Sequence, residues 1–229
     1  MSKQTIETLK ANRMFGGLSD AELTEVAGLF AVKSYEDGDH IFLEGEPSTS
    51  LCLVSTGRVK IVKHTEEGKD VILEIIAPPE IFGGVAVLDG RAYPASAQAM
   101  EKCTVVSLSR QEFLGLMDRF HVLAVEASIY FGDRLRNAYD MLRSISVERV
   151  ERRIASLLLR FGERIGTRKG EETVMELGLT MQEIAEMVGT TVETTIRSMN
   201  KFRKEGLLEY SRGQVRIFPA LRERFTSEP

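Results

Sequence analysis

The alternation of apolar and polar positions divides the chain into three stretches, of which the first covers about residues 1–118. Ser19 and Glu22 form a capping box that marks a short helix near its start. Short apolar or alternating runs follow between glycines, at 41–43, 51–54, 59–62, 71–76 and 104–108. Many short strands at regular turn spacing are typical of a β-sandwich or a small barrel. We therefore predict a β-barrel domain for this stretch.

The second stretch, residues 119–146, reads as one long helix with a heptad seam. Apolar residues recur along it at spacings of 4, 3, 4 and 3, at Phe131, Leu135, Ala138, Leu142 and Ile145. Ala124 and Ser128 extend the same seam upstream. Such a seam buries its stripe against a partner helix, which predicts a dimerisation helix in a parallel homodimer. The alternative is a helix that lies on its own domain.

The third stretch, residues 147–229, opens with an amphipathic helix and then carries two short helix signals. Thr180 and Glu183 form a capping box, and an apolar stripe follows them. Gly189 is suited to end that helix, and Thr191 is suited to cap the next one. Two short helices joined by so tight a turn predict a helix-turn-helix.

The second of these helices carries side chains suited to reading DNA. Glu193 and Arg197 are four residues apart and share one helix face. Arginine can donate two parallel bonds to guanine, and glutamate can accept from cytosine. The basic residues Lys201, Arg203, Lys204 and Arg212 follow, and the runs 207–210 and 214–217 suggest a hairpin wing. We predict binding to double-stranded DNA; the alternative is a surface ion pair on a module that contacts only proteins.

Charge and composition place this basic surface in a soluble protein. The chain has 229 residues, a net charge of −4 and a pI near 5.6, so a nucleic-acid surface must be local. Cys52 and Cys103 give no disulfide framework. The first thirty residues hold no apolar run of signal-peptide type, and no stretch reaches membrane-spanning length. We expect a cytoplasmic protein without a membrane partner.

The sequence argues against an enzyme. His40, His64 and His121 stand 24 and 57 positions apart, and neither H-x-H nor H-E-x-x-H occurs. No Ser/His/Asp motif presents itself either. A barrel enzyme is therefore the weaker alternative to a regulator.

A barrel, a dimer helix and a winged helix-turn-helix, in that order, resemble the cyclic-AMP receptor protein / fumarate-nitrate reduction regulator (CRP/FNR) family. The motifs that carry the resemblance are Tyr35-x-x-Gly38-x-x-Ile41-Phe42-x-x-Gly45, Ser55-Thr56-Gly57-Arg58-Val59-Lys60 and Leu179-Thr180-Met181-Gln182-Glu183-Ile184-Ala185. The resemblance implies an α+β fold with an N-terminal cyclic-nucleotide-binding-like β-barrel of the jelly-roll type. It further implies a homodimeric, sequence-specific transcription regulator, an activator whose partners are DNA and RNA polymerase.

Within that family the recognition helix is closer to the oxygen-responsive branch than to the cyclic-AMP branch. The cyclic-AMP branch has a second arginine where this chain has Val192. The resemblance implies an inverted repeat of TTGAT-like half-sites, with Val192 on a thymine methyl group. Ile196 replaces a frequent serine, so one base pair of the half-site differs. The predicted DNA-binding residues are Thr180, Thr191, Val192, Glu193, Ile196, Arg197, Lys201 and Arg212.

The same resemblance places the effector pocket at Phe82, Gly83, Gly84, Val85, Ala86, Arg91, Tyr93, Pro94, Ala95 and Ser96. In cyclic-nucleotide members a glutamate binds the ribose, and Gly84 stands at its position. The arginine that binds the phosphate corresponds to Pro94, and the nearest substitute cation is Arg91. Loss of that arginine removes the strongest contact to a phosphate. The pattern therefore argues against cyclic AMP.

An iron–sulfur cluster and haem would each need particular ligands from the barrel. An iron–sulfur cluster needs about four cysteine ligands, which two cysteines do not supply. Haem needs one or two axial ligands, for which the three histidines and Met100 are candidates. The segment 93–99 also resembles that of nitric-oxide-responsive members which use haem. The effector stays open between haem, a small organic ligand and a redox signal.

Overall fold

The computed structural model describes residues 3–64, 70–211 and 213–226. These residues form two compact units, which divide between Arg136 and Asn137. The helix predicted over 119–146 is present as α5 (His121–Val147), and its sequence crosses this division. Each unit has its own sheets and its own core, and each is described separately below.

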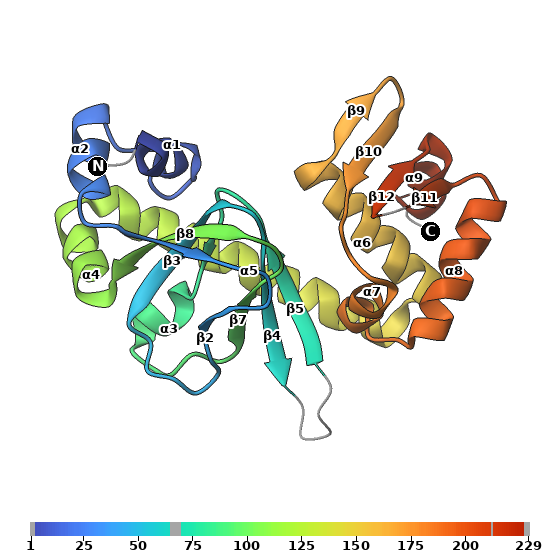
Figure 1. Ribbon diagram of the computed structural model, residues 1–229, viewed down its shortest axis with the longest axis horizontal. Coiled ribbons are helices and arrows are strands. Elements are labelled where there is room, and N and C mark those ends of the chain that lie inside the picture. The colour runs from blue at the N-terminus through green and yellow to red at the C-terminus, as the bar shows by residue number, and fades with distance from the viewer. Residues whose placement is uncertain (1–2, 65–69, 212, 227–229) are drawn as a thin grey trace. The chain divides into compact units, whose positions relative to one another are not determined.

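Two four-stranded antiparallel sheets form the barrel within the described residues (Figure 1). The first sheet has the order β1 (Ala31–Tyr35), β8 (Cys103–Ser109), β3 (Ser50–Thr56) and β6 (Ile81–Phe82). The second has the order β2 (His40–Phe42), β7 (Ser96–Ala99), β4 (Val59–His64) and β5 (Asp70–Ile76). Strands distant in sequence pair within each sheet, as in a jelly roll. The short helix α3 (Gly84–Asp89) lies between β6 and β7 in the chain.

All five runs predicted as strands fall on strands: β2, β3, β4, β5 and β8. Three further strands were not predicted, for reasons that their residues explain. β1 is an edge strand with mostly exposed side chains, so it lacks an apolar alternation. β6 has two residues, and β7 consists of Ser-Ala-Gln-Ala, whose residues have weak strand propensity. Pairing with neighbouring strands, not local propensity, therefore forms these three.

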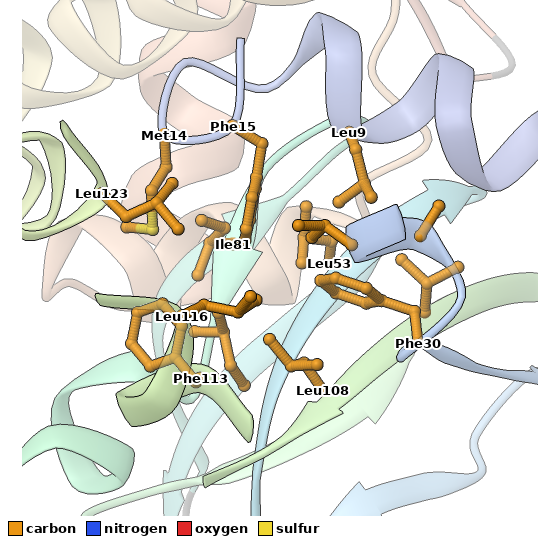
Figure 2. Close-up of a cluster of buried hydrophobic side chains, with 14 of the residues drawn as sticks. Leu9, Met14, Phe15, Phe30, Leu53, Ile81, Leu108, Phe113, Leu116 and Leu123 are labelled. Atoms are coloured by element: carbon orange, nitrogen blue, oxygen red, sulfur yellow. The ribbon is translucent and has the colours of Figure 1, made fainter. Parts of the chain in front are cut away.

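The main core of the first unit lies between a sheet and the helices that cover it. α1 (Lys3–Ala11), α2 (Asp20–Ala27), α4 (Arg110–Arg119) and the start of α5 supply the covering side chains. The predicted capping box of Ser19 and Glu22 begins α2, and a second one, Ser109 with Glu112, begins α4. Figure 2 shows the buried side chains that meet there, among them Leu9, Phe15, Phe30, Leu53, Leu108, Phe113 and Leu123.

The first half of α5 is anchored to its own barrel. The Tyr130 hydroxyl donates to the carbonyl of Ile81 at 2.6 Å. Arg134 forms an ion pair with Glu74 of β5, and its guanidinium lies 5.3 Å from the Tyr130 ring centroid. Phe131 packs against the main core beside these groups. α5 is therefore fixed to the barrel as far as the position where the second unit begins.

In its described residues, the second unit combines the end of α5 and four further helices with one antiparallel sheet, which α6 and α8 contact. The four further helices are α6 (Val150–Ile165), α7 (Met181–Val188), α8 (Val192–Lys204) and α9 (Pro219–Thr226). The sheet order is β11 (Leu208–Ser211), β12 (Gln214–Ile217), β10 (Glu172–Glu176) and β9 (Thr167–Lys169). The buried face of α6 and the predicted wing hairpin β11–β12 are both present. The segment 167–172 is polar, yet it contains β9 and the start of β10, because Arg168 pairs with Thr173 across a tight turn.

Candidate DNA-binding site and barrel interior

The helix-turn-helix is built from local capping interactions. The Thr180 side chain accepts from the backbone N–H of Glu183, whose carboxylate accepts from the backbone N–H of Thr180 in return. Gly189 ends α7 with φ of 65°, a left-handed conformation that favours glycine. Thr191 then caps α8 by accepting from the backbone N–H of Thr194. These contacts place α8 directly after a turn of three residues, 189–191.

Helix α8 has one buried face and one exposed face. Its buried residues are Thr195, Ser198, Met199 and Phe202. On the exposed face, the Nη2 of Arg197 donates to Oε1 of Glu193 at 2.8 Å, and their side chains are 73% and 84% exposed. Ile196 is 41% exposed and adjoins Arg197 in the chain. The structure therefore brings the predicted base-reading side chains to solvent on one helix; their contact with DNA stays a prediction.

The other predicted DNA-binding residues differ in their surroundings. Thr180 and Thr191 are exposed at the N-termini of α7 and α8, while Val192 is half-buried. The Lys201 amine forms a half-exposed ion pair with Glu151 at 3.6 Å. Arg212 lies outside the described residues.

One contact between α8 and the wing was not predicted. The Arg203 guanidinium lies 5.6 Å from the ring centroid of Tyr210 on β11, and Arg203 donates to Asn200 at 3.1 Å. A cation over an aromatic face is attractive. Arg203 therefore joins the recognition helix to the wing, and its place in a run of basic residues gave no signal of this role.

The predicted dimer seam on α5 is partly exposed and partly covered. Leu135, Leu142 and Ile145 are exposed by 53%, 62% and 47%, and Ala138 is also exposed. Phe131 differs from them, because its ring packs against the core of its own barrel. Upstream, the exposed large apolar side chains of α5 are Val122, Val125 and Ile129, of which the last two lie one residue after the expected Ala124 and Ser128. The uncovered part of the predicted seam thus begins at Leu135.

The interior of the barrel is filled by aromatic side chains. Phe42 stacks on Tyr93, with ring centroids 3.7 Å apart and ring planes 8° apart. Phe82 lies 5.8 Å from the Phe42 ring. The Tyr93 hydroxyl donates to the carbonyl of Ser50 at 3.0 Å and accepts from its N–H at 3.2 Å. The buried tyrosine is thereby satisfied within the protein.

The residues predicted to line an effector pocket separate into two groups. Buried among them are Phe82, Gly84, Ala86, Tyr93, Ala95 and Ser96, and Gly83 is half-buried. Val85, Arg91 and Pro94 are exposed. Arg91 is 86% exposed and pairs with Asp89 at 3.8 Å. The Arg91 guanidinium is directed to solvent and to a carboxylate. Arg91 is therefore not in a position to replace the missing phosphate-binding arginine.

Gly84 stands where the family resemblance implies a glutamate in nucleotide-binding members, and its surroundings leave little room for a side chain. A Cβ atom there would lie 3.0 Å from Leu51 Cδ1 and 3.1 Å from the Phe131 ring. We expect Gly84→Glu to lower the free energy of unfolding by at least about 1–3 kcal/mol, through overpacking and burial of a carboxylate. Urea denaturation measures this change.

The neighbouring Val85 supplies a matched control for that substitution. Its side chain is 51% exposed, so Val85→Glu is expected to change the stability by less than about 0.5 kcal/mol. Equal losses in the two variants would contradict the packing described for Gly84.

Within the described residues, the candidate metal ligands do not lie together. No group of three or more His, Cys, Asp or Glu side chains among them is placed to hold a metal ion. His40, His64 and His121 are all exposed, on three separate elements. Burial raises the pKa of the Cys52 thiol to about 12 and also raises the pKa of Cys103. Because the thiolate is the ligand and the nucleophile, both cysteines are poorly suited to metal binding or oxidation.

Within the described ranges, none of the helices combines the length and the apolar character needed to cross a bilayer.

A jelly-roll barrel, a long helix and an exposed recognition helix define a DNA-binding regulator. Residues 32–120 match the cyclic nucleotide-binding domain, and residues 152–224 match the Crp-like helix-turn-helix domain. The cyclic AMP receptor protein of Thermus thermophilus is 28% identical over 209 residues, which cover 91% of this chain and 94% of that protein. The transcriptional activator protein Anr of Pseudomonas aeruginosa is 26% identical over 184 residues, covering 80% and 75%.

The fold is shared with solved structures as well. FixK2 from Bradyrhizobium japonicum matches with a TM-score of 0.77 and 22% identity, over 86% of this chain and 96% of that one. The chain belongs to the CRP/FNR family of transcription regulators. The relatives include both a cyclic AMP receptor protein and the activator Anr, at similar identities. The predicted nearness to the oxygen-responsive branch therefore stays a prediction.

Proposed function

We propose that this regulator is a homodimer that binds an inverted repeat of TTGAT-like half-sites. The observation that carries the proposal is the exposed face of α8, where Glu193 and Arg197 hold each other in one orientation. A recognition helix presents such residues to base edges in the major groove. Arg197 would donate to guanine O6 and N7, and Glu193 would accept from cytosine N4. Ile196 sets the base pair at which the half-site departs from TTGAT.

Dimerisation is proposed to use the exposed apolar stripe Leu135, Ala138, Leu142 and Ile145. Exposed leucines at heptad spacing on one helix are stabilised when a second helix covers them. Two-fold symmetry then places the two recognition helices on half-sites about one helical turn apart. We propose that the dimer acts in the cytoplasm, contacts RNA polymerase as an activator, and has no enzymatic activity.

We propose that Lys201 exchanges its ion pair with Glu151 for a contact with a phosphate group of the DNA. Its ion pair with Glu151 is half-exposed, and such pairs contribute little. We expect Lys201→Ala to weaken binding to all DNA sequences by a similar factor and to reduce the slope of log affinity against log salt by about one. Fluorescence anisotropy between 50 and 200 mM salt, a range over which such contacts respond strongly, measures both effects. A selective loss on the operator alone would contradict a phosphate contact.

The barrel is proposed to sense something other than cyclic AMP. Stacked Phe42 and Tyr93 occupy its interior, and the tight packing at Gly84 disfavours a ribose-binding glutamate there. Pro94 has no cationic side chain that could bind a phosphate. The Lys63 amine donates to the backbone carbonyl of Pro94 and forms an ion pair with Glu44 at 2.7 Å. This differs from what the name of the Thermus thermophilus relative states for that protein.

Among the remaining signals, a small organic ligand is favoured over haem and over oxidation of cysteine. The three histidines are exposed, whereas a haem needs an axial ligand inside a pocket. The raised pKa of both thiols disfavours the reactive thiolate. An absorption spectrum of the purified protein, with and without nitric oxide, checks this; a Soret band would overturn it.

A titration of the purified full-length protein tests the proposed function. The probes are a labelled duplex with the inverted TTGAT repeat, one with a single half-site, and one with scrambled sequence. We expect the inverted repeat to bind at least about 10³-fold more tightly than the scrambled duplex. Cyclic AMP is expected to leave that affinity unchanged. Equal affinity for all three duplexes would contradict the proposal, and tighter binding with cyclic AMP would contradict the proposed role of the barrel.

A further inference from the structure

A half-buried arginine side chain bridges two helix ends in the second unit. Arg153, in the first turn of α6, donates from Nη1 to the carbonyl of Ile145 at 3.1 Å. From Nη2 it donates to the carbonyl of Gly189 at 3.2 Å. Its Nε is buried and has no hydrogen-bond partner in the described part of the chain. One side chain therefore connects the last turn of α5 to the turn of the helix-turn-helix.

The charge of Arg153 is balanced by helix ends and not by a carboxylate. Among the described residues it has no ion pair, and the acids next to it in sequence are engaged elsewhere: Glu148 pairs with Arg152, and Glu151 pairs with Lys201. Ile145 lies in the last turn of α5, and Gly189 caps the C-terminus of α7. The C-terminal end of a helix carries a partial negative charge and carbonyls without helical partners. A cation placed at two such ends stabilises both.

The position of Gly189 makes this contact relevant to DNA reading. Thr191, two residues later, caps α8, so the Gly189 carbonyl lies in the turn that orients the recognition helix. Ile145 lies at the end of the proposed dimer stripe. We propose that Arg153 is a positioning residue that ties the dimer helix to this turn and so sets the angle at which each α8 meets its half-site. The inference rests on the proposed dimeric function.

The sensitive readout is the preferred spacing between half-sites. Inserting or deleting one base pair rotates one half-site by about 35° around the duplex. A dimer with fixed recognition helices tolerates this poorly, whereas one with loosened helices tolerates it better. A residue that only stabilised the fold would not change this preference.

The experiment uses full-length protein and four labelled duplexes. Three carry the inverted repeat at the spacing that wild-type protein prefers, or with one base pair added or removed; the fourth is scrambled. We expect Arg153→Gln to bind the preferred duplex about tenfold more weakly, as for the loss of one charge-assisted hydrogen bond. Its affinity for the two duplexes with altered spacing should fall much less. The ratio between the affinity for the preferred spacing and the affinity for the altered spacings should therefore become smaller than in the wild type.

Two further variants separate positioning from charge and from stability. Arg152→Gln removes the same charge from the neighbouring position of α6 and is expected to keep the wild-type spacing preference. Arg153→Lys keeps the charge but reaches one carbonyl, so intermediate discrimination is expected. Hydrogen exchange of the amides of Gly189 and Thr190, which donate to Glu186 and Ala185, should be faster in Arg153→Gln.

Several results would overturn the inference. One such result is an Arg153→Gln variant that prefers the same half-site spacing as strongly as the wild type does. If the glutamine variant does not fold, a wild-type spacing preference in Arg153→Lys has the same consequence. Equal weakening on all four duplexes, with a salt slope lower by about one, would make Arg153 a phosphate contact instead. Wild-type protein without any spacing preference would contradict the proposed function itself, which distinguishes that failure from a failure of Arg153 alone.

Discussion

Replacing Arg197 with alanine is expected to weaken binding to the specific operator by about 1–3 kcal/mol and to relax discrimination at one guanine of each half-site. The Arg197 side chain is 73% exposed, and its ion pair among the described residues is with Glu193, four residues earlier on the same helix. The fold therefore loses little when it is removed, and the effect appears in DNA recognition. Anisotropy titrations on the operator and on versions with that guanine replaced measure it.

Arg197→Lys is the matched control, because it keeps the charge and loses the bidentate geometry. We expect it to bind scrambled DNA like the wild type but to lose most of the preference for guanine. If Arg197→Ala kept the wild-type ratio between the operator and its guanine-substituted versions, α8 would not read that base through Arg197.

Placing a carboxylate in the α5 seam is expected to abolish dimerisation. Leu135 is 53% exposed in the single chain, so Leu135→Asp leaves the fold of the monomer intact. In the dimer, burial of each of two leucines contributes about 1.5–3 kcal/mol, and the variant would face two carboxylates instead. Sedimentation of the variant at micromolar concentration should therefore give a monomer, with operator binding lost in parallel.

Asn137→Asp supplies the control for the introduced charge. This residue is exposed on α5 and lies off the stripe formed by Leu135, Ala138 and Leu142. It is expected to stay dimeric. A dimer that persists in Leu135→Asp would place the interface on another surface.

The parts of the fold that the sequence predicted are those set by local interactions. The capping boxes at Ser19 and Thr180, the left-handed end at Gly189 and the cap at Thr191 each depend on residues within three or four positions. Such contacts are visible in a sequence. The exposed face of Glu193 and Arg197 followed from the same helix geometry.

The parts that escaped prediction depend on residues far apart in the chain. Phe42 and Tyr93 stack across 51 positions, and no local pattern pairs them. Phe131 fits the heptad of α5, yet its ring packs against its own barrel, because Gly84 and Leu51 leave space for it. Arg153 donates to two backbone carbonyls, one earlier and one later in the chain. Every residue has a backbone carbonyl, so the sequence does not show which ones an arginine will contact.

We propose that two copies of α8 read an inverted repeat through Glu193 and Arg197. The most direct test is selection of tight binders from a pool of fully randomised duplexes by the purified protein, followed by sequencing. We expect a two-fold symmetric motif with TTGAT-like half-sites about one helical turn apart. Each half-site should hold a guanine whose enrichment disappears in Arg197→Ala. Enrichment of an asymmetric motif, or of none, would contradict it.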